Sequence, residues 1–263
     1  MEAIITAGGV SAPDDPLYAR TGVAKKALIP LGGQPMVCWV IEALLGTGLI
    51  DHLVIVGLTA AELNFNHPAL DFVPAAGGLL DNVLVGVDHV RAINPAAQKT
   101  LLCSSDIPLI TSEIVHGFLA ECGSQEAEIY YAIVEEKTME ARFPGSKRTF
   151  VPFKGGRYSG GDVFLLDLAA QGNVELFRSL IGSRKNYLAQ ARMLGLDFIT
   201  RFLLRLMTVE EAAERARQRM NLNARVVVTR FAELGMDLDK AHQYDLIKAE
   251  LEKINLSRTT FNS

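Results

Sequence analysis

The chain has 263 residues and a formal net charge of −4. This length suits one large domain, and the acidic balance argues against a nucleic-acid-binding surface. No stretch of about 20 uncharged apolar residues is present, so we expect no transmembrane segment. Its three cysteines lie apart in apolar runs, which is typical of reduced core residues in a cytoplasmic protein and predicts neither a disulfide nor a zinc site.

The first half of the chain alternates between short apolar runs and segments with apolar residues at helical spacing. The apolar runs predict strands at 3–6, 53–57, 71–74, 100–103 and 129–134. The helical spacing predicts helices over 37–45, around Val83, Val87 and Val90, and over 112–121. Alternating strands and helices favour a mostly parallel sheet with helices packed against it.

The second half changes character. Runs at 150–153 and 162–166 predict strands around glycine turns, and the pattern from 173 to 220 is almost entirely helical. A strand at 225–228 and a final helix follow, and we expect the polar tail 255–263 to be frayed. The sequence thus predicts a single domain over 1–263 with a helical insertion at about 173–222.

The most apolar part of this insertion is the stretch 194–207. Packing within the insertion, a homodimer interface and a lipid-facing surface would each explain it. The sequence does not separate these three alternatives.

Three clusters that follow strand-like runs could carry chemistry. Gly8 and Gly9 follow the first strand, where a glycine turn can bring backbone N–H groups to phosphates. Asp106 follows the strand at 100–103, and Asp237 and Asp239 lie beyond the last strand. Carboxylates at strand ends can hold a divalent ion. Together the clusters predict a chain that handles a nucleoside triphosphate and a metal.

Each cluster also has a purely structural interpretation. Gly8 and Gly9 could form only a tight turn, because neither the dinucleotide-binding pattern nor the P-loop pattern is present. Asp106 could cap a helix or form an Asx-turn. Strand alternation would place Asp237 and Asp239 on one face, so that one binds a metal while the other caps the final helix.

Four motifs, taken in chain order, resemble those of the MobA-like nucleotidyltransferase superfamily. They are the glycine turn with KALIPLGGQPM from Lys26, AGGLLDNV from Ala76, LCSSDIPL from Leu102 and GMDLDK from Gly235. The resemblance implies a Rossmann-like, GT-A type α/β sandwich of three layers with a mostly parallel mixed sheet. Many members carry Gly-x-Gly-x-Arg directly after the first strand, whereas the nearest arginine here is Arg20.

The resemblance also implies a reaction and a set of site residues. The reaction transfers a nucleoside monophosphate from an NTP to a small-molecule acceptor, which we expect to be phosphorylated, and releases pyrophosphate. Lys26 and Asp106 would be catalytic, and Mg²⁺ would be held by Asp106 and Asp239, with Asp237 as the alternative to Asp239. The implied nucleotide-binding residues are Ala7, Gly8, Gly9, Lys26, Gly77, Gly78 and Asn82.

Three segments are candidates for binding the acceptor. Lys147 and Arg148 lie among glycine and hydroxyl residues and could clamp a phosphate, or could belong to a basic hairpin loop. Gly161 and Asp162 resemble the acceptor-side glycine motif of such enzymes. Lys185 precedes a predicted helix of the insertion, whose N-terminal amides would add to an anion site. We therefore expect the insertion to select the acceptor and residues 1–110 to select the nucleotide.

Two other functions are compatible with these residues. A glycosyltransferase of the same fold would use a nucleotide-sugar, but such a donor needs no triphosphate cradle like the loop before Lys26. A non-catalytic nucleotide-binding or regulatory protein would explain why no arginine follows the glycine turn directly. The sequence names neither the base of the NTP nor the acceptor.

Overall fold

The structure is a computed structural model that describes residues 1–263 except 66, 170–199, 202–203, 221–222 and 262–263. The strands are β1 (Glu2–Thr6), β2 (Pro30–Leu31), β3 (Gln34–Pro35), β4 (His52–Val56), β5 (Leu70–Val73), β6 (Lys99–Ser104), β7 (Ile129–Glu135), β8 (Val151–Phe153), β9 (Gly156–Asp167) and β10 (Ala224–Thr229). The α-helices are α1 (Pro16–Thr21), α2 (Met36–Leu45), α3 (Ala60–Leu63), α4 (Leu79–Ile93), α5 (Ser112–Cys122), α6 (Glu136–Arg142), α10 (Val209–Met220) and α11 (Ala241–Phe261). Two 3-10 helices are η1 (Lys26–Leu28) and η2 (Ala232–Gly235).

Within the described residues, the main sheet has eight strands in the order β10-β7-β9-β6-β1-β4-β5, with β8 paired to β9. Strands β6, β1, β4 and β5 are mutually parallel, and β10 is parallel to β7. The long strand β9 is antiparallel to both β6 and β7, so these two neighbours of β9 point the same way. The carboxyl ends of β1, β4, β6, β7 and β10 therefore meet at one edge of the sheet.

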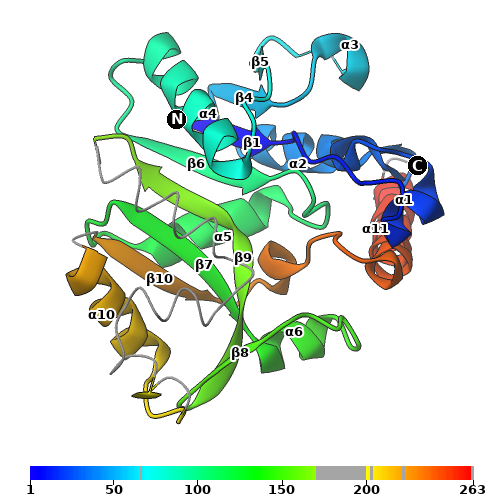
Figure 1. The fold of residues 1–263 in the computed structure, drawn as a ribbon. Coiled ribbons are helices and arrows are strands. Elements are labelled where there is room, and N and C mark those ends of the chain that lie inside the picture. Colours follow the sequence, from blue (N-terminus) through cyan, green and yellow to red (C-terminus); the bar gives the residue numbers. More distant parts are fainter. Residues whose placement is uncertain (66, 170–199, 202–203, 221–222, 262–263) are drawn as a thin grey trace.

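Helices cover both faces of this sheet (Figure 1). Side chains of β1 alternate between the two faces: Ala3 and Ile5 pack toward α2 and α5, and Ile4 packs toward α4. Gly86 allows α4 to lie close to β1, since a Cβ there would be 2.8 Å from Ile4 Cγ2. Burial on both faces explains why the parallel strands are continuous apolar runs in the sequence.

The structure confirms the strands predicted in the first half, whose ends differ by no more than one residue. Sequence patterning missed α1, α3, α6 and the two 3-10 helices, which are too short to show a helical period, and the two-residue strands β2 and β3. The expected strand at 162–166 is also longer than predicted. It begins at Gly156 and runs through Gly160 and Gly161, where we expected a turn.

The helical insertion and the C-terminal tail are the two remaining predictions for the second half. Residues 173–199, 202–203 and 221–222 of the predicted insertion lie outside the described residues, while α10 supplies one of its helices. The helix α11 continues to Phe261, so the tail predicted to fray from residue 255 is helical up to that point. Across the part of the chain that the structure describes, none of the helices has the length and apolar character needed to span a bilayer.

Candidate active site

The glycine turn after β1 lies where three segments approach one another closely. Gly57 has φ +104°, and a Cβ at this position would lie 2.5 Å from the Gly8 nitrogen. A Cβ at Gly8 would in turn lie 2.8 Å from the Asn82 side-chain nitrogen. The other end of this amide, Asn82 Oδ1, accepts a hydrogen bond from the Ala76 N–H at 2.8 Å. Asn82 thereby links the turn after β1 to the loop that contains Gly77 and Gly78.

This contact brings together several residues predicted to bind the nucleotide. Ala7 and Asn82 are buried, while Gly9 is exposed and would have open space around a Cβ. The backbone of Gly78 donates to Asp81 Oδ2 at 3.0 Å, which fixes the start of α4. The glycine turn and the 76–78 loop are therefore adjacent, and their contact with a nucleotide stays a prediction.

Lys26 reaches the same turn because the long loop after β1 folds back on itself. The backbone N–H of Ser11 donates to the Ala24 carbonyl at 2.8 Å, and Val10 and Lys25 form an antiparallel bridge. The N–H of Lys26 then donates to the Gly9 carbonyl at 3.1 Å. The end of the loop therefore pairs with its beginning, which places Lys26 at the carboxyl end of β1.

Two carboxylates share the electrostatic environment of Lys26. Lys26 Nζ lies 3.0 Å from Asp239 Oδ1. The Leu238 N–H donates to the Asp106 carbonyl at 2.8 Å, which holds the segment before Asp239 against the turn after β6. Lys26, Asp106 and Asp239 therefore form one cluster of charges.

Burial raises the pKa of Asp106, and the neighbouring Asp239 carboxylate raises it further. A hydrogen bond from Ser104 Oγ and the Lys26 ammonium act in the opposite direction. The effect of Asp239 shows that the two carboxylates repel each other. A cation bound between them would reduce this repulsion.

The donor set fits a Mg²⁺ ion. Asp106, Asp239 and Ser104 supply hard oxygen atoms, and protein-bound Mg²⁺ usually has one or two carboxylate ligands together with phosphate or water oxygens. Within the described ranges, no group of three or more His, Cys, Asp or Glu side chains is arranged to hold a metal. Water and substrate phosphate oxygens are the ligands that usually complete the coordination of a Mg²⁺ held by one or two carboxylates.

Asp237 has a different partner from Asp239. Its carboxylate forms an ion pair with Arg148, whose Nη2 also lies 3.5 Å from the Gly160 carbonyl oxygen. The segment from Asp237 to Asp239 follows η2 and is not a strand, so the expected alternation that would put both carboxylates on one face does not apply. Asp239 thus contacts Lys26 and Asp237 contacts Arg148, while the choice of metal ligand between them stays a prediction.

The predicted acceptor residues occupy different environments. Arg148 is largely buried beside Asp237, whereas Lys147 is exposed, and the Lys147 carbonyl accepts a hydrogen bond from Lys240 Nζ at 3.4 Å. Burial raises the pKa of the Cys103 thiol, and the negative charge of Asp162 raises it further. The Asp162 carboxylate therefore lies near Cys103, at the end of β6. Lys185 lies outside the described residues.

Gly161 has a clear packing role. A Cβ at this position would lie 2.9 Å from the Ala132 carbonyl oxygen and 3.1 Å from that of Leu234. The glycine therefore lets η2 approach β7 and β9, which in turn positions Asp237 and Asp239. Its assignment to the acceptor stays a prediction.

Two contributors to the site were missed in the sequence. Gly57 was assigned only as the last residue of a strand, and its positive φ and its contact with Gly8 depend on how β1 and β4 pair. Ser104 stands two residues before Asp106, the spacing at which a hydroxyl can bond to the carboxylate, and this local signal could have identified it.

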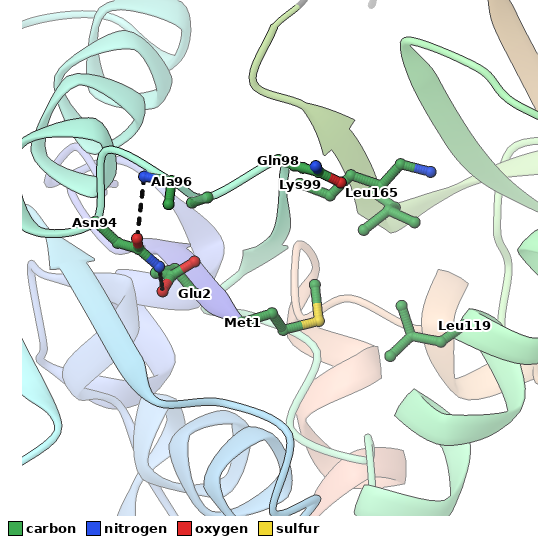
Figure 2. Close-up of a pocket in the computed structure, with 9 residues that line it drawn as sticks. Met1, Glu2, Asn94, Ala96, Gln98, Lys99, Leu119 and Leu165 are labelled. Atoms are coloured by element: carbon green, nitrogen blue, oxygen red, sulfur yellow. Dashed lines mark hydrogen bonds between the residues drawn. The ribbon is translucent and has the colours of Figure 1, made fainter.

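A separate pocket lies at the amino ends of β1 and β6, far along these strands from the glycine turn. Figure 2 shows the Asn94 side chain, which donates to Glu2 Oε1 at 2.7 Å, together with Met1, Leu119 and Leu165 around this pocket. None of the predicted site residues lines it. The pocket is therefore distinct from the candidate site at the carboxyl ends of the strands.

A family model for the MobA-like NTP transferase domain matches residues 3–184, which include the glycine turn, Lys26 and Asp106. The chain belongs to this family. It is thus a nucleotidyltransferase-type enzyme, and the family resemblance is confirmed; the first three of the four motifs lie within the matched residues.

Solved structures show the same fold. A hypothetical transferase from Thermus thermophilus is 35% identical with a TM-score of 0.79, covering 93% of this chain and 100% of that one. A 4-diphosphocytidyl-2C-methyl-D-erythritol synthase from Anaerococcus prevotii is 11% identical with a TM-score of 0.56, covering 95% and 97%. A CMP:2-keto-3-deoxy-manno-octonic acid synthetase complexed with CTP is 12% identical with a TM-score of 0.59, covering 96% and 98%. None of the curated proteins matches the chain.

Proposed function

We propose that this transferase moves a nucleoside monophosphate from an NTP to a small acceptor that carries a phosphate, in a reaction that depends on Mg²⁺. The observation that carries the proposal is the cluster of Lys26, Asp106 and Asp239 beside the exposed turn of Gly8 and Gly9. An acceptor oxygen would form a bond to the α-phosphorus while the bond from that phosphorus to the bridging oxygen breaks. Pyrophosphate would leave with that oxygen.

The chain's own residues would bind and orient the triphosphate. Backbone N–H groups at Gly8 and Gly9 and the ammonium of Lys26 would lie near the α-phosphate, where negative charge increases in the transition state. The hydrogen bond from Lys26 to Asp239 holds the ammonium in place before substrate arrives, so little reorganisation is needed.

Asp106 and Asp239 would hold the metal ion. Mg²⁺ bound there would neutralise phosphate charge and orient the reacting groups. Ser104 would fix the orientation of the Asp106 carboxylate, and the backbone bond from Leu238 to Asp106 would fix the spacing of the two carboxylates.

No general base is required if the attacking oxygen belongs to an ionised phosphate. On the acceptor side, Asp162 beside the end of β6 and the exposed Lys147 are the charged groups that we assign to acceptor recognition. The largely buried Arg148 would act mainly by holding Asp237 and the segment that leads to Asp239.

The test is pyrophosphate release with each of the four common NTPs and a panel of phosphorylated acceptors. We expect at least one combination to react in the parent protein, and Asp106→Asn to lower the rate by about 10²-fold or more because a neutral amide is a poorer ligand for a hard cation. Asp88→Asn is a matched control, since Asp88 is an exposed carboxylate on α4 paired with Arg91. Equal rates for the parent and Asp106→Asn would contradict the proposed role.

A further inference from the structure

The loop after β1 carries a second lysine whose contact the proposed mechanism does not use. Lys25 precedes Lys26 directly, and its ammonium forms an ion pair with Glu62 of α3. Each of these two side chains is about one-third exposed, at 36% and 33%. Ion pairs this open to water contribute little to stability, so this one can exchange for another partner.

This ion pair joins the two segments that flank the glycine turn. The bridge from Val10 to Lys25 and the hydrogen bond from Lys26 to Gly9 place Lys25 next to the turn after β1. Glu62 lies shortly after Gly57, which packs against Gly8. The Lys25 backbone thus lies next to the turn after β1, and its ammonium is held by a carboxylate from the segment after β4.

Arg20, the arginine of this loop, is held elsewhere. Its Nη2 lies 2.5 Å from Asp245 Oδ1, and its guanidinium lies over the Tyr244 ring, 5.9 Å from the centroid. Both partners belong to α11. Lys26, in turn, is directed toward Asp239. Of these three cations of the loop, Lys25 is the one whose partner belongs to the segment after β4, whereas Arg20 and Lys26 are paired to carboxylates of the C-terminal segment.

We propose that Lys25 is a second cation for the triphosphate, and that its ion pair with Glu62 is exchanged for phosphate oxygens beyond the α-phosphate when the nucleotide binds. This inference rests on the proposed function, because it requires a triphosphate at Gly8 and Gly9. Glu62 then has two effects in the free protein: it holds Lys25 near the site, and its negative charge opposes the incoming phosphates.

A purely structural pair would behave differently from an exchanged one. If Lys25 and Glu62 only fastened the loop to α3, removal of either charge would weaken the binding of every nucleotide. If the pair is exchanged, removal of Lys25 weakens triphosphate binding while removal of the Glu62 charge strengthens it. The number of phosphates on the ligand gives an independent criterion, because a monophosphate does not reach Lys25.

The experiment measures dissociation constants by calorimetry with Mg²⁺, using ATP, GTP, CTP and UTP and the matching monophosphates. The variants are Lys25→Ala, Lys25→Arg and Glu62→Gln. Glutamine at position 62 can still accept the capping hydrogen bond from the Thr59 N–H, so α3 keeps its cap. Lys253→Ala is the control, since Lys253 is an exposed lysine paired with Glu250 on α11.

We expect Lys25→Ala to raise the dissociation constant of the bound NTP about tenfold and to leave that of the monophosphate within about twofold. Lys25→Arg should restore NTP affinity, and Glu62→Gln should lower the NTP dissociation constant a few-fold. An unchanged NTP constant in Lys25→Ala, or equal weakening of NTP and monophosphate in both Ala and Gln variants, would overturn the inference. A parent protein that binds none of the four NTPs would overturn the proposed function and this inference with it.

Discussion

The two sides of the candidate site are held together by different forces. Around Gly8, the backbone of Gly57 and the amide of Asn82 approach so closely that no side chain fits between them. Around Asp237 and Asp239, the segment after η2 is held by ion pairs to Arg148 and Lys26. The first side is a closely packed backbone cradle, which we propose binds phosphate. The second is an arrangement of charges that a metal or substrate can rebalance.

The largest effect should come from placing a side chain in the closely packed cradle. Gly57→Ala adds a Cβ about 2.5 Å from the Gly8 nitrogen at a φ of +104°. Steric overlap and left-handed strain together should lower the free energy of unfolding by about 4 kcal/mol, measured by urea denaturation.

Gly155→Ala separates these two causes. Gly155 has a similar φ of +92°, but nothing lies within 4 Å of a Cβ there, so only the strain of about 1 kcal/mol should appear. If both variants lost the same stability, close packing at Gly8 would not explain the cradle.

A smaller effect is expected from removing the Lys26 ammonium, which links the glycine turn to Asp239. Lys26→Ala should lower kcat by about 10²-fold, because the ammonium acts on charge that increases in the transition state. The NTP dissociation constant should change much less. The measurement is steady-state kinetics beside calorimetric binding, and a raised KM at constant kcat would reassign Lys26 to ground-state binding.

On the ion-paired side, removal of one partner should cost stability rather than turnover. Arg148→Met keeps most of the side-chain volume but leaves the Asp237 carboxylate without its cation. We expect the free energy of unfolding to fall by about 2 kcal/mol, as measured by urea denaturation. A variant with full stability and a strongly raised acceptor KM would instead make Arg148 an acceptor ligand.

The sequence allowed Gly8 and Asp106 to be singled out because each follows a regular strand. Runs such as β1 and β6 are apolar along their whole length, and the residues after parallel strands must meet at one edge of the sheet. This reasoning placed Gly8 and Asp106 together without any knowledge of side-chain contacts.

The remaining features depend on contacts between segments far apart in the chain. The 3-10 helix η2 separates β10 from Asp237, so strand alternation could not predict that Asp237 and Asp239 take different partners. The role of Gly161 required the position of the Leu234 carbonyl, which no local pattern specifies. Long-range packing of irregular segments is what sequence periodicity leaves undetermined.

The assignment of the metal ligands is tested most directly by the Mg²⁺ dependence of pyrophosphate release in Asp239→Asn and Asp237→Asn, two matched substitutions two residues apart. Asp239→Asn should lower the rate by about 10²-fold or more at any Mg²⁺ concentration reached, because it removes a ligand for a hard cation. Asp237→Asn should keep the Mg²⁺ dependence of the parent and lose only stability, through its contact with Arg148. The reverse result, with Asp237→Asn inactive and Asp239→Asn active, would contradict this account of the site.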